Sequence, residues 1–286
     1  MRRDFFVVTL LVAIASLLVQ AQAQTSRVGA SYFKRANQRF AKGDVDGAIA
    51  DFAIAIMADP QFAMAYNNRG VARERINDTT GAIADYSKAI EIDPRLSEGY
   101  ANRGRARLAQ RDLDEALSDC DAAIRLTPRL AQAYDTRGSV RFEKGDLEGA
   151  LADYCSALAI NPHLAQSYSN RGALLRARGD LEGALADYDR SIKINPHLAN
   201  TYNNRGNVWR EKGRLEEAIA DFDKAIELNP KLALPHASRG LVRVMQGRSG
   251  ESDKDFAKCI ELDPNLKPFI EEGIRRVQRQ LAELQH

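Results

Sequence analysis

The residues from Asn161 to Pro196 read NPHLAQSYSNRGALLRARGDLEGALADYDRSIKINP, and the stretch nearly reproduces itself when shifted by 34 residues in either direction. Prolines mark the period, because seven of them stand 34 residues apart: Pro60, Pro94, Pro128, Pro162, Pro196, Pro230 and Pro264. Self-similarity at such a fixed period is the signature of a protein built from stacked repeats. A chain of this kind grows by adding repeats rather than by enlarging one core.

Each repeat is predicted to be a pair of antiparallel helices. Nearly every repeat has a large residue at position 4, glycine at 8, alanine at 20, an aromatic residue at 24 and proline at 32. Spacings of three and four residues favour helices over strands, and the proline ends the second helix. The small residues at positions 8 and 20 are expected to lie where the two helices cross. We place the repeat starts at Gly29, Ala63, Ser97, Ala131, Ala165, Ala199 and Ala233.

These residues resemble the tetratricopeptide repeat, whose pattern they follow from position 4 to position 32. The resemblance covers residues 29–266 and implies an all-α, right-handed superhelical solenoid of seven helix-turn-helix repeats. The predicted repeats are 29–62, 63–96, 97–130, 131–164, 165–198, 199–232 and 233–266, preceded by a short segment, 24–28.

A C-terminal capping helix is predicted over residues 267–286. It has an apolar stripe at helical spacing, formed by Ile270, Ile274, Val277, Leu281 and Leu284, and charged residues fill its other face. Such a helix would cover the exposed side of the last repeat. The alternative is an amphipathic helix that binds a partner.

Residues 1–23 are predicted to be a secretory signal peptide. Charged residues begin the chain, an apolar run extends from Phe5 to Val19, and Ala21-Gln22-Ala23 matches a cleavage site. The run is short for a membrane span, which needs about 20 residues. We therefore expect an exported protein, periplasmic or secreted, with no membrane span after cleavage. An anchor formed by an uncleaved signal is the alternative.

The charges argue against a binder of polyanions. Lys and Arg total 41 against 39 Asp and Glu, and no block of like charge stands out, so a nucleic-acid partner is not expected. The three cysteines, Cys120, Cys155 and Cys259, are expected to be small buried hydrophobic residues rather than disulfides. His163 and His197 fall at the same position of adjacent repeats, too far apart for one metal ion. Neither cofactor nor metal is predicted, and no catalytic motif is present.

Arginine stands at position 7 and aspartate at position 23 of all seven repeats. Both positions are equidistant from the turn, so each arginine is expected to meet the aspartate of its own hairpin or of a neighbour. We interpret this pattern as structural ion pairs, with a ligand-binding array as the alternative. The pairs begin with Arg35 and Asp51 and recur to Arg239 and Asp255.

The resemblance implies that first helices line a concave groove, with positions 2, 5, 9, 12 and 13 facing a ligand. Asparagine also recurs at position 6, as in superhelical repeats of O-GlcNAc transferase, where it contacts peptide backbone; alternatively it binds backbone of an adjoining repeat. The clamp that grips acidic C-termini of cytosolic chaperones is absent, since Phe33 and Glu98 replace its lysines. The candidate groove residues are Asn68, Asn102, Asn170, Asn204, Gln166, Ser169, Arg176, Asn203, Asn207 and Arg210.

The predicted function is a non-catalytic scaffold that binds an extended peptide or protein segment in this groove. One alternative is a structural component of a cell-envelope assembly or polysaccharide-export complex; an enzyme is a weaker one. Glycan sites usually need several exposed aromatic residues, and the groove offers Phe33, Phe40 and Phe142 as candidates. The sequence does not identify the partner or the oligomeric state.

Overall fold

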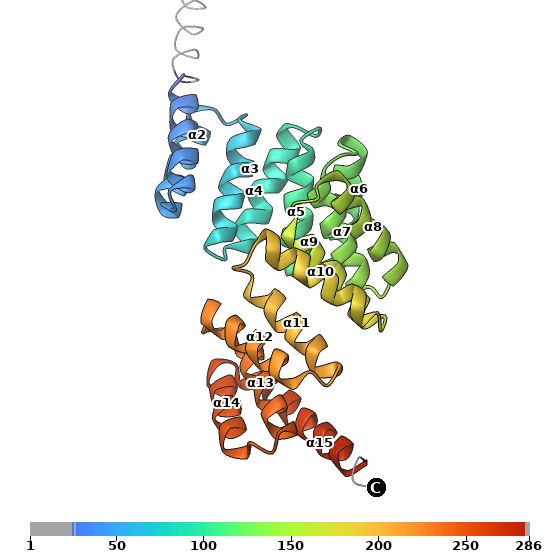
Figure 1. Ribbon diagram of the computed structural model, residues 1–286. Helices are drawn as coiled ribbons and strands as arrows, with labels where there is room; N and C mark the ends of the chain where they lie inside the picture. Colours follow the sequence, from blue (N-terminus) through green and yellow to red (C-terminus); the bar gives the residue numbers. More distant parts are fainter. Residues whose placement is uncertain (1–24, 26, 284–286) are drawn as a thin grey trace, which may run out of the picture. The chain divides into compact units, whose positions relative to one another are not determined.

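Helical pairs make up the chain, as Figure 1 shows. The computed structural model describes residue 25 and residues 27–283, so the predicted signal peptide and Leu284 lie outside the described residues. Two helices form in each repeat and one more helix follows, which confirms the all-α fold of seven helical pairs plus a C-terminal helix. The right-handed superhelix stays a prediction.

The helices have nearly constant lengths, because the repeat fixes their ends. The first helix is described over residues 27–41 and pairs with α2 (Val45–Ala58). The next pairs are α3 (Ala63–Arg75) with α4 (Thr79–Ile92) and α5 (Ser97–Ala109) with α6 (Leu113–Leu126), and the chain continues with α7 (Ala131–Glu143) and α8 (Leu147–Ile160). They are followed by α9 (Ala165–Ala177) with α10 (Leu181–Ile194), α11 (Ala199–Glu211) with α12 (Leu215–Leu228), and α13 (Ala233–Met245) with α14 (Ser249–Leu262).

The chain divides into two compact units, one ending at Asp146 and the other beginning at Leu147. Within the first unit α3 contacts α5, and α5 contacts α7; within the second unit α9 contacts α11, and α11 contacts α13. First helices of neighbouring repeats therefore lie side by side in each unit. Each second helix packs against the first helix of the next repeat as well, as α4 does on α5.

The glycine at position 8 permits the close crossing of the two helices of a repeat. A Cβ added to Gly172 would lie 2.9 Å from Cε1 of Tyr188, a carbon of the aromatic ring at position 24. The expected crossing at small residues is therefore present, but the glycine faces this ring first rather than the alanine at position 20. Gly104 differs, because it meets the Sγ atom of Cys120 at 3.1 Å and the backbone oxygen of Ala116 at 3.2 Å.

The turn inside each repeat needs a left-handed backbone. Gly179 has a φ of 83°, a conformation that glycine adopts without steric cost. Arg111 takes the same place in repeat 3 with a φ of 63°, where an L-residue is disfavoured. Asp180 then caps the N-terminus of α10, because its Oδ1 accepts a hydrogen bond from the Gly183 amide at 2.9 Å.

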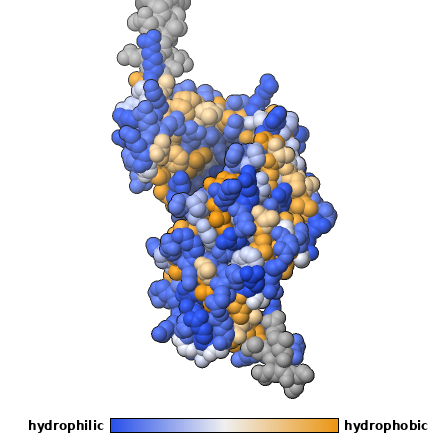
Figure 2. Space-filling view, in the orientation of Figure 1, coloured by the Kyte–Doolittle hydropathy of each residue, from blue (hydrophilic) through white to orange (hydrophobic). Residues whose placement is uncertain are grey.

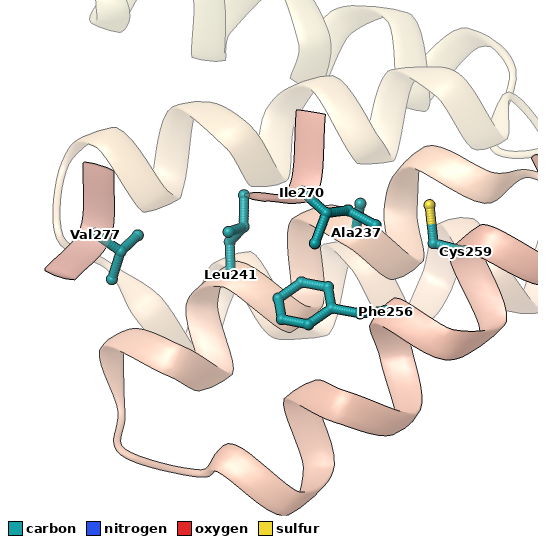
Figure 3. Packing of buried hydrophobic residues seen from close by; sticks show 6 residues of the cluster. All are labelled: Ala237, Leu241, Phe256, Cys259, Ile270 and Val277. Carbon is teal, nitrogen blue, oxygen red and sulfur yellow. The ribbon is translucent and has the colours of Figure 1, made fainter. Parts of the chain in front are cut away.

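The C-terminal helix, α15 (Lys267–Glu283), follows a short 3-10 helix, η1 (Pro264–Leu266), and packs against α13. Ile270 and Val277 of its predicted stripe are buried and Ile274 is partly buried against the same cluster. Figure 3 shows Leu241 between Ile270 and Val277. This helix therefore covers the last repeat, as expected of a cap.

Candidate binding surface

The arginine at position 7 forms hydrogen bonds with the aspartate at position 23 of its own hairpin. In repeat 5, Nε of Arg171 donates to Oδ2 of Asp187 at 2.7 Å, and Nη2 donates to Oδ1 at 2.8 Å. The predicted pairing is confirmed within the hairpin in six repeats, and every aspartate concerned is buried. The other pairs are Arg35–Asp51, Arg69–Asp85, Arg103–Asp119, Arg205–Asp221 and Arg239–Asp255.

The same arginines also bind residues that the sequence reasoning did not include. Arg171 lies over the ring of Tyr168, with 5.6 Å from Cζ to the ring centroid. Nη1 of Arg205 donates to Oδ1 of Asp189, at position 25 of the preceding repeat, at 2.6 Å. Each such arginine therefore holds its own hairpin and can also link it to the repeat before it.

A second arginine, at position 11, shares the aspartate in several repeats. Arg107 donates to Asp119 at 2.7 Å, and Arg243 donates to Asp255 at the same distance. Repeats 5 and 6 have Leu175 and Trp209 at this position instead. The recurrence of arginine at position 11 was visible in the sequence and could have predicted this contact.

These contacts show that the arginine–aspartate pattern braces the fold. The hydrogen bond from Arg35 lowers the pKa of Asp51, and the bond to Asp187 raises the pKa of Arg171. Both directions favour the charged forms that attract each other. The guanidinium groups of these arginines bind partners within the protein. The contacts therefore favour the interpretation as structural ion pairs over the alternative of a ligand-binding array.

Asparagine side chains join repeats 1 to 3 in the first compact unit. Nδ2 of Asn68 donates to Oδ1 of Asn37 at 2.9 Å, and Nδ2 of Asn67 donates to Oδ1 of Asn68 at 3.1 Å. Asn102 then donates to Oδ1 of Asn67, also at 3.1 Å. The position-6 asparagines Asn68 and Asn102 thus brace adjoining repeats through side-chain amides, and not through the backbone as the alternative reading expected.

The position-6 asparagines of repeats 5 and 6 have different surroundings. Oδ1 of Asn170 accepts a hydrogen bond from Nε2 of Gln166, an exposed residue, at 2.8 Å. Asn204 is half-buried, and its side chain makes no hydrogen bond within the described chain. Among the described residues, Asn204 therefore does not extend to repeat 6 the kind of amide contact that joins repeats 1 to 3.

Two of the candidate groove residues are buried. Ser169 is 3% exposed, and its Oγ accepts a hydrogen bond from Oγ1 of Thr201 at 3.0 Å. Asn203 is 6% exposed, its backbone oxygen accepts a bond from Nδ2 of Asn207 at 2.9 Å, and its Oδ1 has no partner among the described residues. A buried acceptor without a donor is uncommon, because it loses its bond to water on folding.

Arg176 and Arg210, the two candidate arginines, differ in their pairing. Nε and Nη2 of Arg176 both donate to Oε1 of Glu211, at 2.9 and 2.5 Å. Arg210 is half-buried but forms neither an ion pair nor a hydrogen bond with any described residue. Burial lowers the pKa of Arg210, and the positive charges of Arg176 and Arg276 lower it further while Glu211 opposes them.

A cavity of about 530 Å³ lies between α11, α13 and α15. Its apolar lining comes from Leu241 and Met245 of α13 and from Phe269 and Val277 of α15. Its charged lining comes from Arg210, Glu211, Glu272 and Arg276. The cavity is within the size range of small-ligand sites. Because α15 forms one wall, reasoning from the repeats alone missed it.

The cysteines differ in their exposure. Cys120 and Cys259 are fully buried, as expected, and burial raises the pKa of the Cys259 thiol. Cys155 is exposed, which corrects the expectation for that residue: position 25 faces outward, where its Sγ lies 3.5 Å from Nη1 of Arg171. No two of the three cysteines form a disulfide.

Neither a metal centre nor a membrane span is found in the described part of the chain. Among residues 25 and 27–283, no group of three or more histidine, cysteine or acidic side chains could hold a metal ion. No helix in that range combines the length and the apolar character needed to cross a bilayer. On the face shown in Figure 2, hydrophilic and apolar residues alternate over short distances.

Family models match most of the repeat region. A tetratricopeptide repeat model matches residues 199–232, a second model of the repeat matches residues 138–176 and 172–209, and a third matches residues 33–97. No significant match to a curated protein sequence was found.

Solved structures share the fold. A repeat protein from Parabacteroides merdae aligns with a TM-score of 0.65 and 19% identity, covering 88% of this chain and 99% of that one. The Cut9–Hcn1 hetero-tetramer of the APC/C gives a TM-score of 0.71 at 16% identity, covering 85% of this chain and 54% of that one. PilF from Pseudomonas aeruginosa aligns with a TM-score of 0.62 and 15% identity, covering 76% of this chain and 97% of that one. At these identities the likeness concerns the fold alone.

Proposed function

Because this chain belongs to the tetratricopeptide repeat proteins, we propose that it is a non-catalytic scaffold that binds an extended protein segment along the first helices of its repeats. Proteins of this family typically hold other proteins together. The segment would lie on α9 and α11 in the second compact unit.

The unpaired amide of Asn204 is the observation that carries this proposal. The side-chain amides of its counterparts Asn68 and Asn102 donate hydrogen bonds to neighbouring repeats. The side-chain amide of Asn204 forms no hydrogen bond within the described chain. An amide both donates and accepts, as does each peptide unit of an extended backbone. A bound segment would therefore satisfy Asn204 without requiring a particular side chain, and the exposed Gln166 would offer a second contact.

A triple variant tests this surface: Gln166→Ala, Asn204→Ala and Asn207→Ala. The control changes Arg190→Ala and Lys193→Ala, both exposed on α10. Each protein, starting at residue 24, is cross-linked in extract and its partners are quantified by mass spectrometry. We expect the triple variant to lose most partners that the wild type and the control retain. Equal recovery by all three proteins would overturn the assignment of this surface.

A glycan-binding role in an envelope assembly has less support. Phe33 is packed against Phe52 and Phe62, with ring centroids 5.8 and 4.7 Å away, and Phe40 lies under the Arg75 guanidinium. These rings are therefore engaged within the protein rather than offered as stacking platforms. The first proposal instead uses the polar side chains of α9 and α11, among them the unpaired amide of Asn204.

Export is the second part of the proposal. It rests on the apolar run and cleavage pattern within residues 1–23. Expression of the full chain in a Gram-negative host, followed by fractionation and mass measurement, tests it. A periplasmic product that begins at Gln24 is the expected result. A full-length product in the cytoplasm would contradict export, and a full-length product in the membrane would indicate an uncleaved anchor.

A further inference from the structure

The cavity between α11, α13 and α15 combines an apolar floor with a rim of charges. Leu241 is 3% exposed and Val277 is 6% exposed, whereas Phe269, which also lines the cavity, is 48% exposed. Gly273 brings α15 close to α13, because an added Cβ would lie 2.9 Å from both Cδ atoms of Leu241. The cap helix is therefore seated closely enough to form a wall of the cavity with the last repeat.

The negative charges on the rim are already neutralised by cations outside the cavity lining. Glu211 accepts two hydrogen bonds from Arg176. Glu272 pairs with Arg275 at 3.0 Å and with Arg279 at 3.2 Å. Glu272 is thus engaged outside the cavity, and the charge of Glu211 is shared between Arg176, which it bonds, and the neighbouring Arg210, which it only attracts.

The positive charges on the rim have no such partners. Arg210 and Arg276 form no ion pair and no hydrogen bond with the described residues. Burial lowers the pKa of Arg210, and the positive charge of Arg276 is one of the charges that lower it further, so the two guanidinium groups repel each other. Two guanidinium groups beside an apolar floor favour an anion that has an apolar group attached to it.

The chemistry of a protein's last residue fits both features. Its carboxylate and its side chain leave the same Cα, so an anion and an apolar group arrive together. An aspartate or glutamate in the middle of a chain is followed by backbone on both sides. Both backbone segments would have to be accommodated at the cavity together with the side chain. Inorganic phosphate would use the arginines but not the floor, and a metal cation would be repelled.

We propose that this cavity binds the C-terminal residue of a partner protein, with its carboxylate between Arg210 and Arg276 and a large apolar side chain on Leu241, Met245 and Phe269. This inference rests on the proposed function, since it names the end of the segment that the first helices hold. It assigns a ligand role to the cap helix as well as a structural one.

Peptide binding tests the proposal directly. The probe is a library of fluorescent octapeptides, labelled at the N-terminus, in which the last residue is fixed and the others are mixed. We expect pools ending in Leu, Met, Ile or Phe to bind best as free acids, and the same pools with a C-terminal amide to bind at least about tenfold more weakly, the loss of one charged hydrogen bond.

Variants localise the carboxylate. Arg210→Ala and Arg276→Ala should each reduce binding of the free acids by about tenfold, and the double variant should bind acids and amides equally. Arg190→Ala removes the same charge from an exposed position of α10 and should leave the preference intact. Neither pocket arginine forms an ion pair or hydrogen bond with a described residue that the substitution would remove, so both variants should melt no lower than the wild type.

The possible outcomes separate this inference from the proposed function. Equal binding of acids and amides by the wild type would overturn the carboxylate pocket while the scaffold proposal stands. A preference that survives the double variant would place the carboxylate elsewhere and also overturn the inference. Failure of every pool to bind would count against both. A further set of pools has a glutamate fixed at an internal position and a C-terminal amide. Tighter binding of this set than of the free acids would overturn the inference and reassign the cavity to acidic side chains.

Discussion

The guanidinium of Arg171 and the carboxylate of Asp187 form a two-point hydrogen bond across the helices of repeat 5, at 2.7 and 2.8 Å. The carboxylate is nearly buried, with its side chain 8% exposed, whereas the arginine is 22% exposed. A parallel fork of this kind fixes both distance and orientation. The pair therefore sets how α9 and α10 meet, and its recurrence gives the hairpins the same geometry.

Asp187→Ala should destabilise the protein by about 3 kcal/mol, the order seen when one partner of a buried ion pair is removed. The loss leaves Arg171 without its acceptor. Thermal unfolding followed by circular dichroism measures the effect. The control, Glu227→Ala, breaks an exposed pair with Lys224 and should change stability by less than about 1 kcal/mol. Equal melting temperatures for the two variants would contradict a structural role for the pair.

The hairpin and its ion pair could be predicted because both follow from register. Once the turn is placed, positions 7 and 23 must lie opposite each other, whatever the neighbouring repeats do. The repeated Arg171–Asp187 pattern supplied the residues, and seven copies of the repeat made the register certain.

The asparagine contacts and the cavity could not be predicted in the same way. Whether Asn68 reaches Asn37 depends on side-chain rotamers and on the spacing of two repeats, which no single repeat encodes. The cavity depends on where α15 settles on α13, and this helix has no counterpart in the repeat. Cys155 was expected to be buried like the other two cysteines, but position 25 faces outward on the second helix of repeat 4.

Gly172→Ala should destabilise the protein by about 1–3 kcal/mol, because the new Cβ would press on the Tyr188 ring at 2.9 Å. Gly250→Ala is the matched control. It lies in α14 with nothing within 4 Å of the added Cβ, so the gain in helix propensity should stabilise by up to about 1 kcal/mol. Urea unfolding of the two variants should therefore shift in opposite directions. A shift of both in one direction would contradict the packing explanation.

Asn68→Ala should lower stability by about 1 kcal/mol or more, because it removes bonds to Asn37 and Asn67 and leaves part-buried amides unpaired. Asn204→Ala should leave the melting temperature unchanged, since its amide makes no bond within the described chain, but should weaken partner binding. Melting curves and the cross-linking assay separate the two roles. A large loss of stability in Asn204→Ala would show that Asn204 stabilises the repeats, as Asn68 does, and would contradict its role in partner binding.

Stability should fall at alkaline pH because of two buried tyrosines. Burial raises the pKa of Tyr86, as does its bond to Glu74, and burial raises the pKa of Tyr188. The unfolded chain releases these protons above about pH 10 while the folded chain retains them, so the stability present below pH 10 is lost as pH rises above it. Each tyrosine lowers the free energy of unfolding by at most about 1.4 kcal/mol for each pH unit in this range. Urea midpoints from pH 8 to 12 measure the slope, which should be shallower in the Tyr86→Phe/Tyr188→Phe variant.

The same two tyrosines should respond oppositely to loss of the hydroxyl. The Tyr86 hydroxyl donates to Oε2 of Glu74 at 2.5 Å, and Arg105 supports that carboxylate at 2.7 Å. Repeat 5 places Arg176 where repeat 2 has Glu74, so the Tyr188 hydroxyl has no acceptor and makes no bond within the described chain.

Tyr86→Phe should therefore lower the free energy of unfolding by about 1.5 kcal/mol or more, the contribution of a hydrogen bond to a charged group. Tyr188→Phe should be neutral or stabilise by up to about 1 kcal/mol, because it removes a buried hydroxyl that no residue satisfies. Melting temperatures at pH 7 compare the two variants. If Tyr188→Phe instead lowers stability as much as Tyr86→Phe does, the Tyr188 hydroxyl must have a partner in solution. A loss of peptide binding in Tyr188→Phe at unchanged stability would identify that partner as the bound segment.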